Sequence, residues 1–335
     1  MPAWFMRQAG RSLPEYRAIR GSGSILDLVK EPEAAAEITL QPVRRYGVDA
    51  AIIYSDIMVP VAAVGFGIEV TQGRGPVVAE PFTREADLAR LRPLEAPSDV
   101  AFTLEAIKMA VAELESAGVP LIGFAGAPFT VASYLVEGGP SSTYVKTKTL
   151  MWDDPPLFGR LLAVLAQMAL DFARAQVGAG AAAVQLFDSW TGALSPGEYE
   201  RFVLPHTRSV MEGLADLGVP LIHFGVGASH LMKLMAGCGC DVLGVDWRMP
   251  LGNAKAVAAS TPGGPQAVQG NLDPVYCIAP WKVLSDRALA VLREGGGIGH
   301  VFNLGHGVLP GTDPGMLSRL VELVHSTDPA VLAHG

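Results

Sequence analysis

The chain has 335 residues, of which 50% are hydrophobic and only 17% are charged, and this composition excludes an intrinsically disordered protein. Its 25 basic and 33 acidic side chains give a net charge of −8, which disfavours a general nucleic-acid-binding protein, because such proteins carry basic surfaces. The length fits either two ordinary domains or one large α/β barrel.

The start of the chain and the cysteine content indicate a cytoplasmic protein. Arg7 and Arg11 interrupt an N-terminal segment that lacks a long apolar core, so we expect no secretory signal peptide. The apolar stretch Leu161–Leu170 is about half a bilayer span, so we expect neither a transmembrane segment nor a membrane partner. An odd number of cysteines is typical of a reducing compartment and argues against a disulfide framework. The three cysteines are Cys238, Cys240 and Cys277.

Eight short, continuous apolar runs recur along the chain and are typical of parallel strands buried on both faces. In chain order they are Ala3–Met6, Ala50–Tyr54, Val119–Phe124, Ala181–Phe187, Val219–Phe224, Val242–Val245, Ala267–Val268 and His300–Leu304.

Most of these runs are separated by segments with helical periodicity. Phe102–Ala117 carries an apolar stripe, and Ser195 with Glu198 forms a capping box that opens another helix. Thr312–Pro314 opens the last helix in a similar way. Eight alternations of strand and helix predict a (β/α)₈ barrel of the TIM type as a single domain over residues 1–335, with an open doubly wound sheet as the alternative.

In such a barrel the functional groups follow the carboxyl ends of the strands, and here every one of those positions is polar, glycine-bearing or both. The segments concerned begin with the sequence RQAGR (7–11) and end with Gly305–Gly307. A single polar site at one end of the barrel is therefore expected.

Four arginines fall within fourteen residues near the start of this acidic chain: Arg7, Arg11, Arg17 and Arg20. Guanidinium groups stay protonated and bind carboxylates or phosphates in a bidentate way, so the cluster predicts a site for an anionic ligand. Phosphate is disfavoured because neither a P-loop nor a dinucleotide-binding glycine motif is present. A solvated basic helix face is an equally open interpretation from composition alone.

Four further side chains stand at predicted strand ends. Asp56 either accepts substrate N–H groups and balances a developing cation, or caps a helix or pairs with an arginine. Tyr134 and Ser189, taken alone, are typical of structural hydrogen bonding. His306 lies between two glycines, where the backbone can approach a ligand closely. The cysteines do not have zinc-ligand spacing, so no metal is predicted and they are expected to be small buried residues.

Six segments together closely resemble the uroporphyrinogen decarboxylase family of haem biosynthesis. They are FMRQAGRSLPEYR (5–17), YSDIMV (54–59), GAPFTVASYLVEGG (126–139), QLFDSW (185–190), GNLDP (270–274) and FNLGHGVLPGTDP (302–314). The resemblance runs along almost the whole chain. Members of that family usually have residues upstream of the matching Pro2–Gln8 segment, whereas this chain starts at Met1.

The resemblance implies a distorted (β/α)₈ barrel, a homodimer, no metal or organic cofactor, and removal of four acetate carboxyl groups from uroporphyrinogen III to give coproporphyrinogen III. It implies that Arg7, Arg11 and Arg20 bind substrate carboxylates and that Asp56 lies under the macrocycle. Tyr134, Ser189 and His306 would contact or position the substrate side chains. Asp56 and Arg7 are the expected catalytic residues, with His306 or a water as the alternative proton donor.

Two other functions remain open at this stage. A related methyltransferase would bind zinc through a His-x-Cys pair, but His223 is followed by Phe224 and Gly225. A tetrapyrrole-binding protein without catalytic activity would need the arginines but not Asp56.

Overall fold

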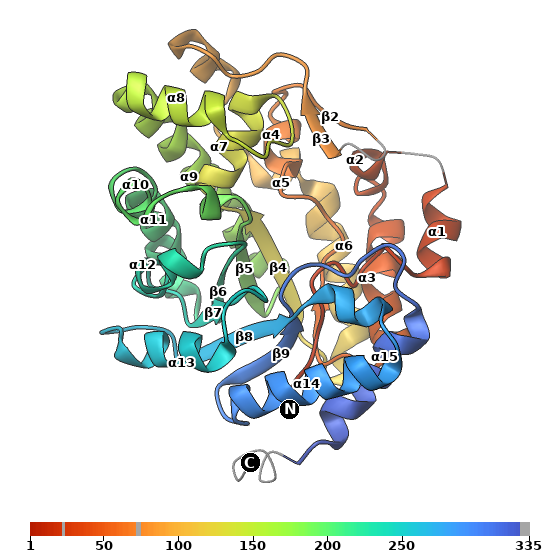
Figure 1. Ribbon diagram of the computed structural model, residues 1–335. Coiled ribbons are helices and arrows are strands. Elements are labelled where there is room, and N and C mark those ends of the chain that lie inside the picture. The colour runs from red at the N-terminus through yellow and green to blue at the C-terminus, as the bar shows by residue number, and fades with distance from the viewer. Residues whose placement is uncertain (22–23, 72–74, 329–335) are drawn as a thin grey trace.

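The computed structural model of the protein describes residues 1–21, 24–71 and 75–328, and Figure 1 shows strands at the centre surrounded by helices. Seven parallel strands form one sheet in the order β1-β4-β5-β6-β7-β8-β9. They are β1 (Ala51–Ile52), β4 (Leu121–Gly126), β5 (Ala183–Asp188), β6 (Leu221–Gly225), β7 (Val242–Gly244), β8 (Ala267–Leu272) and β9 (His300–Leu304). The predicted barrel class is confirmed.

The first predicted strand, Ala3–Met6, is reduced to a single bridge. Ala3 pairs in parallel with Phe302 of β9, and its carbonyl accepts a hydrogen bond from the Asp49 N–H at 2.8 Å, so the segment lies between β9 and the start of β1. The ladder stops there because the next N–H groups bond to side chains. The Phe5 N–H donates to Gln8 Oε1, and the Met6 N–H donates to Asn303 Oδ1.

Strand ends also differ from the sequence prediction. The apolar run predicted β8 to end at Val268, but β8 continues through Gly270 and Asn271 to Leu272, so these polar residues belong to the strand. Their backbone groups pair with β9 throughout, from Val268–His300 to Leu272–Leu304. Apolar character marks where a strand is buried, whereas backbone pairing decides where it ends.

A chain of buried polar side chains crosses the inside of the barrel. Trp4 Nε1 donates to Gln269 Oε1 at 3.0 Å, and Gln269 Nε2 donates to Gln185 Oε1 at 2.8 Å. All three side chains are buried, so each of these hydrogen bonds is costly to break. They fix the initial segment, β8 and β5 relative to one another.

Fifteen α-helices lie in the described part of the chain. They are α1 (Pro14–Arg20), α2 (Ile25–Leu28), α3 (Pro32–Tyr46), α4 (Val59–Ala63), α5 (Ala96–Asp99), α6 (Ala101–Leu114), α7 (Pro128–Glu137), α8 (Val145–Asp153), α9 (Pro155–Gly178), α10 (Pro196–Glu198), α11 (Leu204–Leu214), α12 (Met232–Ala236), α13 (Leu251–Ser260), α14 (Trp281–Gly295) and α15 (Pro314–Ser326). The capping box at Ser195 and the Asp313 cap of α15 are both present, as predicted.

Helix α9 is the one described helix that is long and apolar enough to cross a membrane by length and composition. Its most apolar window is 56% buried inside the molecule, and the helix packs against α7, α11 and β4. This is the burial expected of a core helix, so the apolar character of α9 is weak support for a membrane span.

A two-stranded antiparallel hairpin of β2 (Ile68–Thr71) and β3 (Gly75–Val78) lies outside the barrel sheet. It was not predicted, because strands were assigned only to continuous apolar runs and its sequence, IEVT and GPVV, is short and mixed in character. In Figure 1 the hairpin lies near α2, α4 and α7.

Candidate active site at the carboxyl ends of the strands

The loop that carries Arg7 and Arg11 has an unusual backbone. Both arginines have left-handed φ angles, 58° and 55°, and Gly10 between them has a φ of 95°. Left-handed conformations are unfavourable for residues with a side chain, and they persist where the surrounding structure enforces them. The loop therefore holds two long cationic side chains in positions that an unconstrained chain would avoid.

Neighbouring strands enforce this conformation. Gln8 is buried, and its Nε2 donates to the Ala50 carbonyl at 2.8 Å, which ties the loop to the start of β1. On the other side the Val308 N–H donates to the Met6 carbonyl at 2.9 Å, next to the loop after β9. The loop is thus fastened both to the strand that leads to Asp56 and to the segment that carries His306.

None of the four clustered arginines forms an ion pair with an acidic side chain within the described residues. Arg17 donates a hydrogen bond to the Pro310 carbonyl at 3.1 Å, and the Arg20 guanidinium lies 5.9 Å from the centre of the Tyr16 ring. Other arginines of this protein, such as Arg174, are held by a carboxylate. The unpaired charges of Arg7, Arg11 and Arg20 leave them available for an anionic ligand.

Asp56 follows β1 and is half-buried. Its Oδ1 accepts a hydrogen bond from the Met58 N–H at 2.8 Å, a local turn of the kind that aspartate favours. Burial raises the pKa of this carboxyl above its ordinary value, and the Met58 N–H and the charge of Arg7 act in the opposite direction. The local turn and the influence of the Arg7 charge both fit the structural interpretation of Asp56, and its role as an acceptor for substrate N–H groups stays a prediction.

Tyr54 links Arg20 to the segment that carries Asp56. Its hydroxyl lies 3.2 Å from that of Tyr16, over whose ring the Arg20 guanidinium is placed. Burial, followed by the hydrogen bond to Tyr16, raises the pKa of Tyr54, while the charge of Arg20 lowers it. Arg20 thus approaches the segment Tyr54–Asp56 from α1.

Tyr134 lies on α7 and is held by an aromatic stack. Its ring centre is 3.8 Å from that of Trp190, with an angle of 29° between the planes. The Trp190 N–H donates to Thr130 Oγ1, which itself donates to the buried carboxylate of Asp188 at 2.9 Å. Burial raises the pKa of Tyr134, and the charges of Asp56 and Arg7 reach it as well. Tyr134 therefore lies in the same electrostatic environment as Asp56 and Arg7.

Ser189 follows Asp188 at the end of β5 and is half-buried, and its hydroxyl has no hydrogen-bond partner among the described residues. Arg11 is likewise half-buried and lies four residues after Arg7. No described contact joins either side chain to Asp56, so their place in the site rests on their positions at the strand ends.

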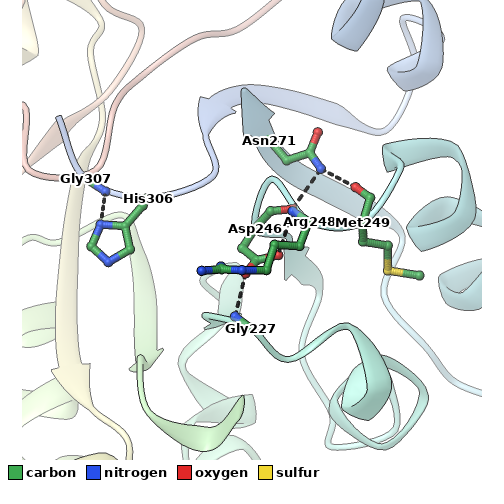
Figure 2. A network of polar contacts seen from close by, with 7 residues as sticks. All are labelled: Gly227, Asp246, Arg248, Met249, Asn271, His306 and Gly307. Carbon is green, nitrogen blue, oxygen red and sulfur yellow. Dashed lines mark hydrogen bonds and ion pairs between the residues drawn. The ribbon is translucent and has the colours of Figure 1, made fainter. Parts of the chain in front are cut away.

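His306 follows β9 and contributes a neutral imidazole. Its Nδ1 accepts a hydrogen bond from the Gly307 N–H at 2.7 Å, which leaves Nε2 as the protonated nitrogen (Figure 2). Burial, followed by the charges of Arg7 and Arg248, lowers the pKa of His306 to about 4, while the charge of Asp246 acts in the opposite direction. The ring is therefore uncharged at neutral pH and can donate one hydrogen bond through Nε2.

The segment after β7, Asp246–Arg248, is one of the polar strand ends, and none of its residues was predicted as a site residue. Asp246 is buried, and its carboxylate accepts hydrogen bonds from the Gly227 N–H and from Arg248 Nη1, the latter at 2.6 Å. Asn271 Nδ2 donates to the carbonyls of Asp246 and Met249, as Figure 2 shows. The signal available in the sequence was the polar triplet Asp246–Arg248 directly after an apolar run.

The cysteines are buried and free, as predicted. Cys238 Sγ lies 3.2 Å from His223 Nδ1, yet no group of three or more histidine, cysteine or acidic side chains in the described chain is arranged to hold a metal ion. A cavity of about 500 Å³ lies beside α2 and α4, but none of the seven predicted site residues lines it. The position of the candidate site is therefore indicated by the polar side chains at the strand ends and not by this cavity.

Comparisons with known proteins agree with these motifs. The family model described as uroporphyrinogen decarboxylase (URO-D) matches residues 1–327. A uroporphyrinogen decarboxylase of Salinispora tropica is 56% identical over 97% of this chain and 86% of its own length. One of Streptomyces coelicolor is 55% identical over 97% of this chain and 90% of its own.

Among solved structures, a methyltransferase from Methanosarcina mazei superposes with a TM-score of 0.78. It covers 96% of this chain and 93% of its own at 21% sequence identity, which supports the fold alone. The family model and the high identity over nearly the full length are decisive for classification. This chain belongs to the uroporphyrinogen decarboxylase family.

Proposed function

We propose that this protein is a carboxy-lyase that removes the four acetate carboxyl groups of uroporphyrinogen III without a cofactor and yields coproporphyrinogen III. The observation that carries the proposal is that Arg7 and Asp56 lie near enough at one end of the barrel for the charge of Arg7 to lower the pKa of the Asp56 carboxyl. Family membership supports the choice of substrate. A polyanionic macrocycle needs cations at its periphery and an acceptor for the N–H groups at its centre, and this site offers both.

The arginines supply the binding energy for carboxylates. Arg7 and Arg11 come from the strained first loop and Arg20 from α1, and none of them has an internal acidic partner in the described chain. A guanidinium that is not already paired can form a bidentate ion pair with a substrate carboxylate. Tyr134, Ser189 and the neutral His306 would complete the site as hydrogen-bonding groups that orient the side chains.

Loss of carbon dioxide requires an electron sink, and the substrate can provide it. Protonation of a pyrrole carbon makes that ring cationic. The bond from the methylene carbon to the carboxylate then breaks, its electron pair enters the ring, and carbon dioxide leaves. Asp56 would stabilise the cationic ring and accept hydrogen bonds from the pyrrole N–H groups, which is electrostatic preorganisation. A second proton, delivered to the methylene carbon as the ring loses its extra proton, completes the methyl group.

The proton donor is assigned to Arg7 rather than to His306. The pKa of His306 is lowered to about 4, so at neutral pH its imidazole is not an acid of suitable strength. Arg7 is the guanidinium whose charge acts on Asp56, and guanidinium groups in proteins carry protons that they can donate. A guanidinium with a pKa above about 12 is a weak general acid, so proton delivery is expected to limit the rate.

The decisive experiment is anaerobic incubation of the purified protein with uroporphyrinogen III, followed by chromatographic separation of products by carboxylate number. Products with seven, six, five and four carboxylates are expected in succession. Tight binding of unchanged substrate would identify a binding protein without catalytic activity and refute the proposal. Zinc retained in stoichiometric amount after dialysis, with no decarboxylation, would favour a methyltransferase.

We also propose that the protein is a cytoplasmic homodimer with a single catalytic domain. Support comes from the family resemblance and from the three buried free thiols, which suit a reducing compartment. Light scattering coupled to size-exclusion chromatography tests the dimer, and a mass corresponding to one chain would refute it.

A further inference from the structure

Arg248 differs from the other arginines outside the first loop because its guanidinium is held in place while only some of its N–H groups donate hydrogen bonds. Nη1 donates to the carboxylate of Asp246 at 2.6 Å, and the guanidinium carbon lies 3.9 Å from the centre of the Trp247 ring. The side chain remains 47% exposed. Nη2 and Nε donate no hydrogen bond within the described chain, so part of the planar donor fork faces outward.

The backbone under Arg248 is held from several directions. The Asp246 carboxylate accepts the N–H of Gly227 and the N–H of Arg248 itself. Asn271 of β8 donates to the carbonyls on either side of the turn. A side chain built on such a clamped turn loses little freedom when a ligand binds, which favours tight and oriented recognition.

This turn also touches the segment that carries His306. A Cβ added to Gly305 would lie 2.4 Å from the Trp247 backbone nitrogen, so the two loops pack directly against each other. The rings of Trp247 and His306 are 6.3 Å apart, and the guanidinium of Arg248 points toward the imidazole in Figure 2. The charges of Arg7 and Arg248 both act on His306. Cationic groups from the first loop and from the β7 loop therefore meet at this histidine.

We propose that Arg248 is a further substrate-binding residue: with Trp247 as its platform and Asp246 as its anchor, it forms a subsite beside His306 for an alkyl carboxylate of the tetrapyrrole. This inference rests on the proposed function. The Asp246 ion pair fixes the guanidinium and uses one of its five donors, and the guanidinium carbon lies over the Trp247 ring. Asp246 is a positioning residue, because it acts through Arg248.

The test compares Arg248→Gln with Arg319→Gln. Arg319 is the matched control, because its guanidinium also lies 3.9 Å from the centre of a tryptophan ring, that of Trp281, but on the outer helix α15. KM and kcat are measured anaerobically with uroporphyrinogen III, and the dissociation constant of coproporphyrinogen III is measured by equilibrium dialysis. We expect R248Q to raise KM about tenfold, the usual loss for one charge-assisted hydrogen bond, with kcat within about twofold. R319Q should match the wild type.

The two ligands distinguish the source of the carboxylate. Coproporphyrinogen III retains the propionates and has lost the acetates, so weaker binding of both ligands to R248Q assigns the subsite to a propionate. Weaker binding of uroporphyrinogen alone assigns it to an acetate. The dialysis measurement needs no turnover, so it reads a propionate subsite even if the wild type releases no carbon dioxide, an outcome that would refute the proposed function separately. In that case uroporphyrinogen III is not consumed, and equilibrium dialysis with it reads an acetate subsite.

Loss of Arg248 leaves the buried carboxylate of Asp246 without its cation, and this can destabilise the fold. The double variant D246N/R248Q removes both charges and keeps an oxygen to accept the Gly227 N–H, so it serves as the second test. An unchanged KM and an unchanged affinity for both ligands, in whichever variant remains folded by circular dichroism, would overturn the assignment.

Discussion

The position of Arg7 can be tested without removing any functional group. A Cβ added at Gly307 would lie 2.5 Å from Arg7 Cδ, 2.7 Å from Cγ and 3.0 Å from Cβ. Carbon atoms prefer separations of about 3.5–4.0 Å, so Gly307→Ala must move the Arg7 side chain by about 1 Å. Gly307 does not have a left-handed φ, so alanine fits its backbone. A displacement of about 1 Å costs on the order of 10²-fold in an oriented reaction.

We therefore expect G307A to lower kcat/KM for uroporphyrinogen III about 100-fold while the protein remains folded. Gly311→Ala is the matched control, because Gly311 belongs to the same loop and an added Cβ there meets no atom within 4 Å. Initial rates are measured anaerobically by chromatography, and thermal melts verify folding. If G307A retains activity within about threefold of G311A, the packing of Arg7 against Gly307 does not set the catalytic geometry.

Three further results are expected. Asp56→Asn keeps an oxygen for the Met58 N–H but removes the charge, so kcat should fall on the order of 10²-fold, and near-normal turnover would remove Asp56 from the mechanism. Arg11→Ala should raise KM for the octacarboxylate more than for partly decarboxylated intermediates, whereas equal losses would indicate a structural role. His300 is buried and donates through Nε2 to the Gly270 carbonyl, and burial lowers its pKa from 6.5 to about 4. In acid the unfolded chain therefore binds more protons at this residue than the folded chain does. His300 should lower the free energy of unfolding by about 2 kcal/mol between about pH 7 and pH 5. Urea titrations of His300→Gln should not show this loss. An unchanged pH dependence in that variant would contradict the assignment.

The strand positions were predictable because parallel strands buried on both faces leave continuous apolar runs. The prediction of a full strand over Ala3–Met6 was wrong. The Gln8 and Asn303 side chains accept hydrogen bonds from backbone N–H groups of this segment, and these N–H groups therefore do not pair with a neighbouring strand. Such partners lie far apart in sequence, and periodicity does not reveal them. The end of β8 was misplaced for a related reason, because Gly270 and Asn271 pair through their backbones and lack apolar side chains.

The site was predictable only where a residue type and a strand end coincide. Asp56 and His306 were selected in this way, and the charge of Arg7 acts on both. The assignment of all seven side chains to substrate binding stays a prediction. Arg248 was overlooked because a lone arginine beside an aspartate has the pattern of a surface ion pair. Its significance depends on Trp247 and on the loop after β9, which only three-dimensional packing brings together.

The fastening of the first loop to β9 has a consequence for biosynthesis of the protein itself. The hydrogen bond from the Met6 N–H to Asn303 spans 297 positions of the chain, and the Val308 N–H reaches back to the Met6 carbonyl as well. During translation Arg7, Arg11 and the Ala50 carbonyl that holds Gln8 emerge early, whereas Asn303 and Val308 emerge close to the end. A ribosome-bound fragment that ends before β9 would therefore carry these arginines in a loop without its attachments to Asn303 and Val308, and the complete binding site would form only when synthesis is nearly finished.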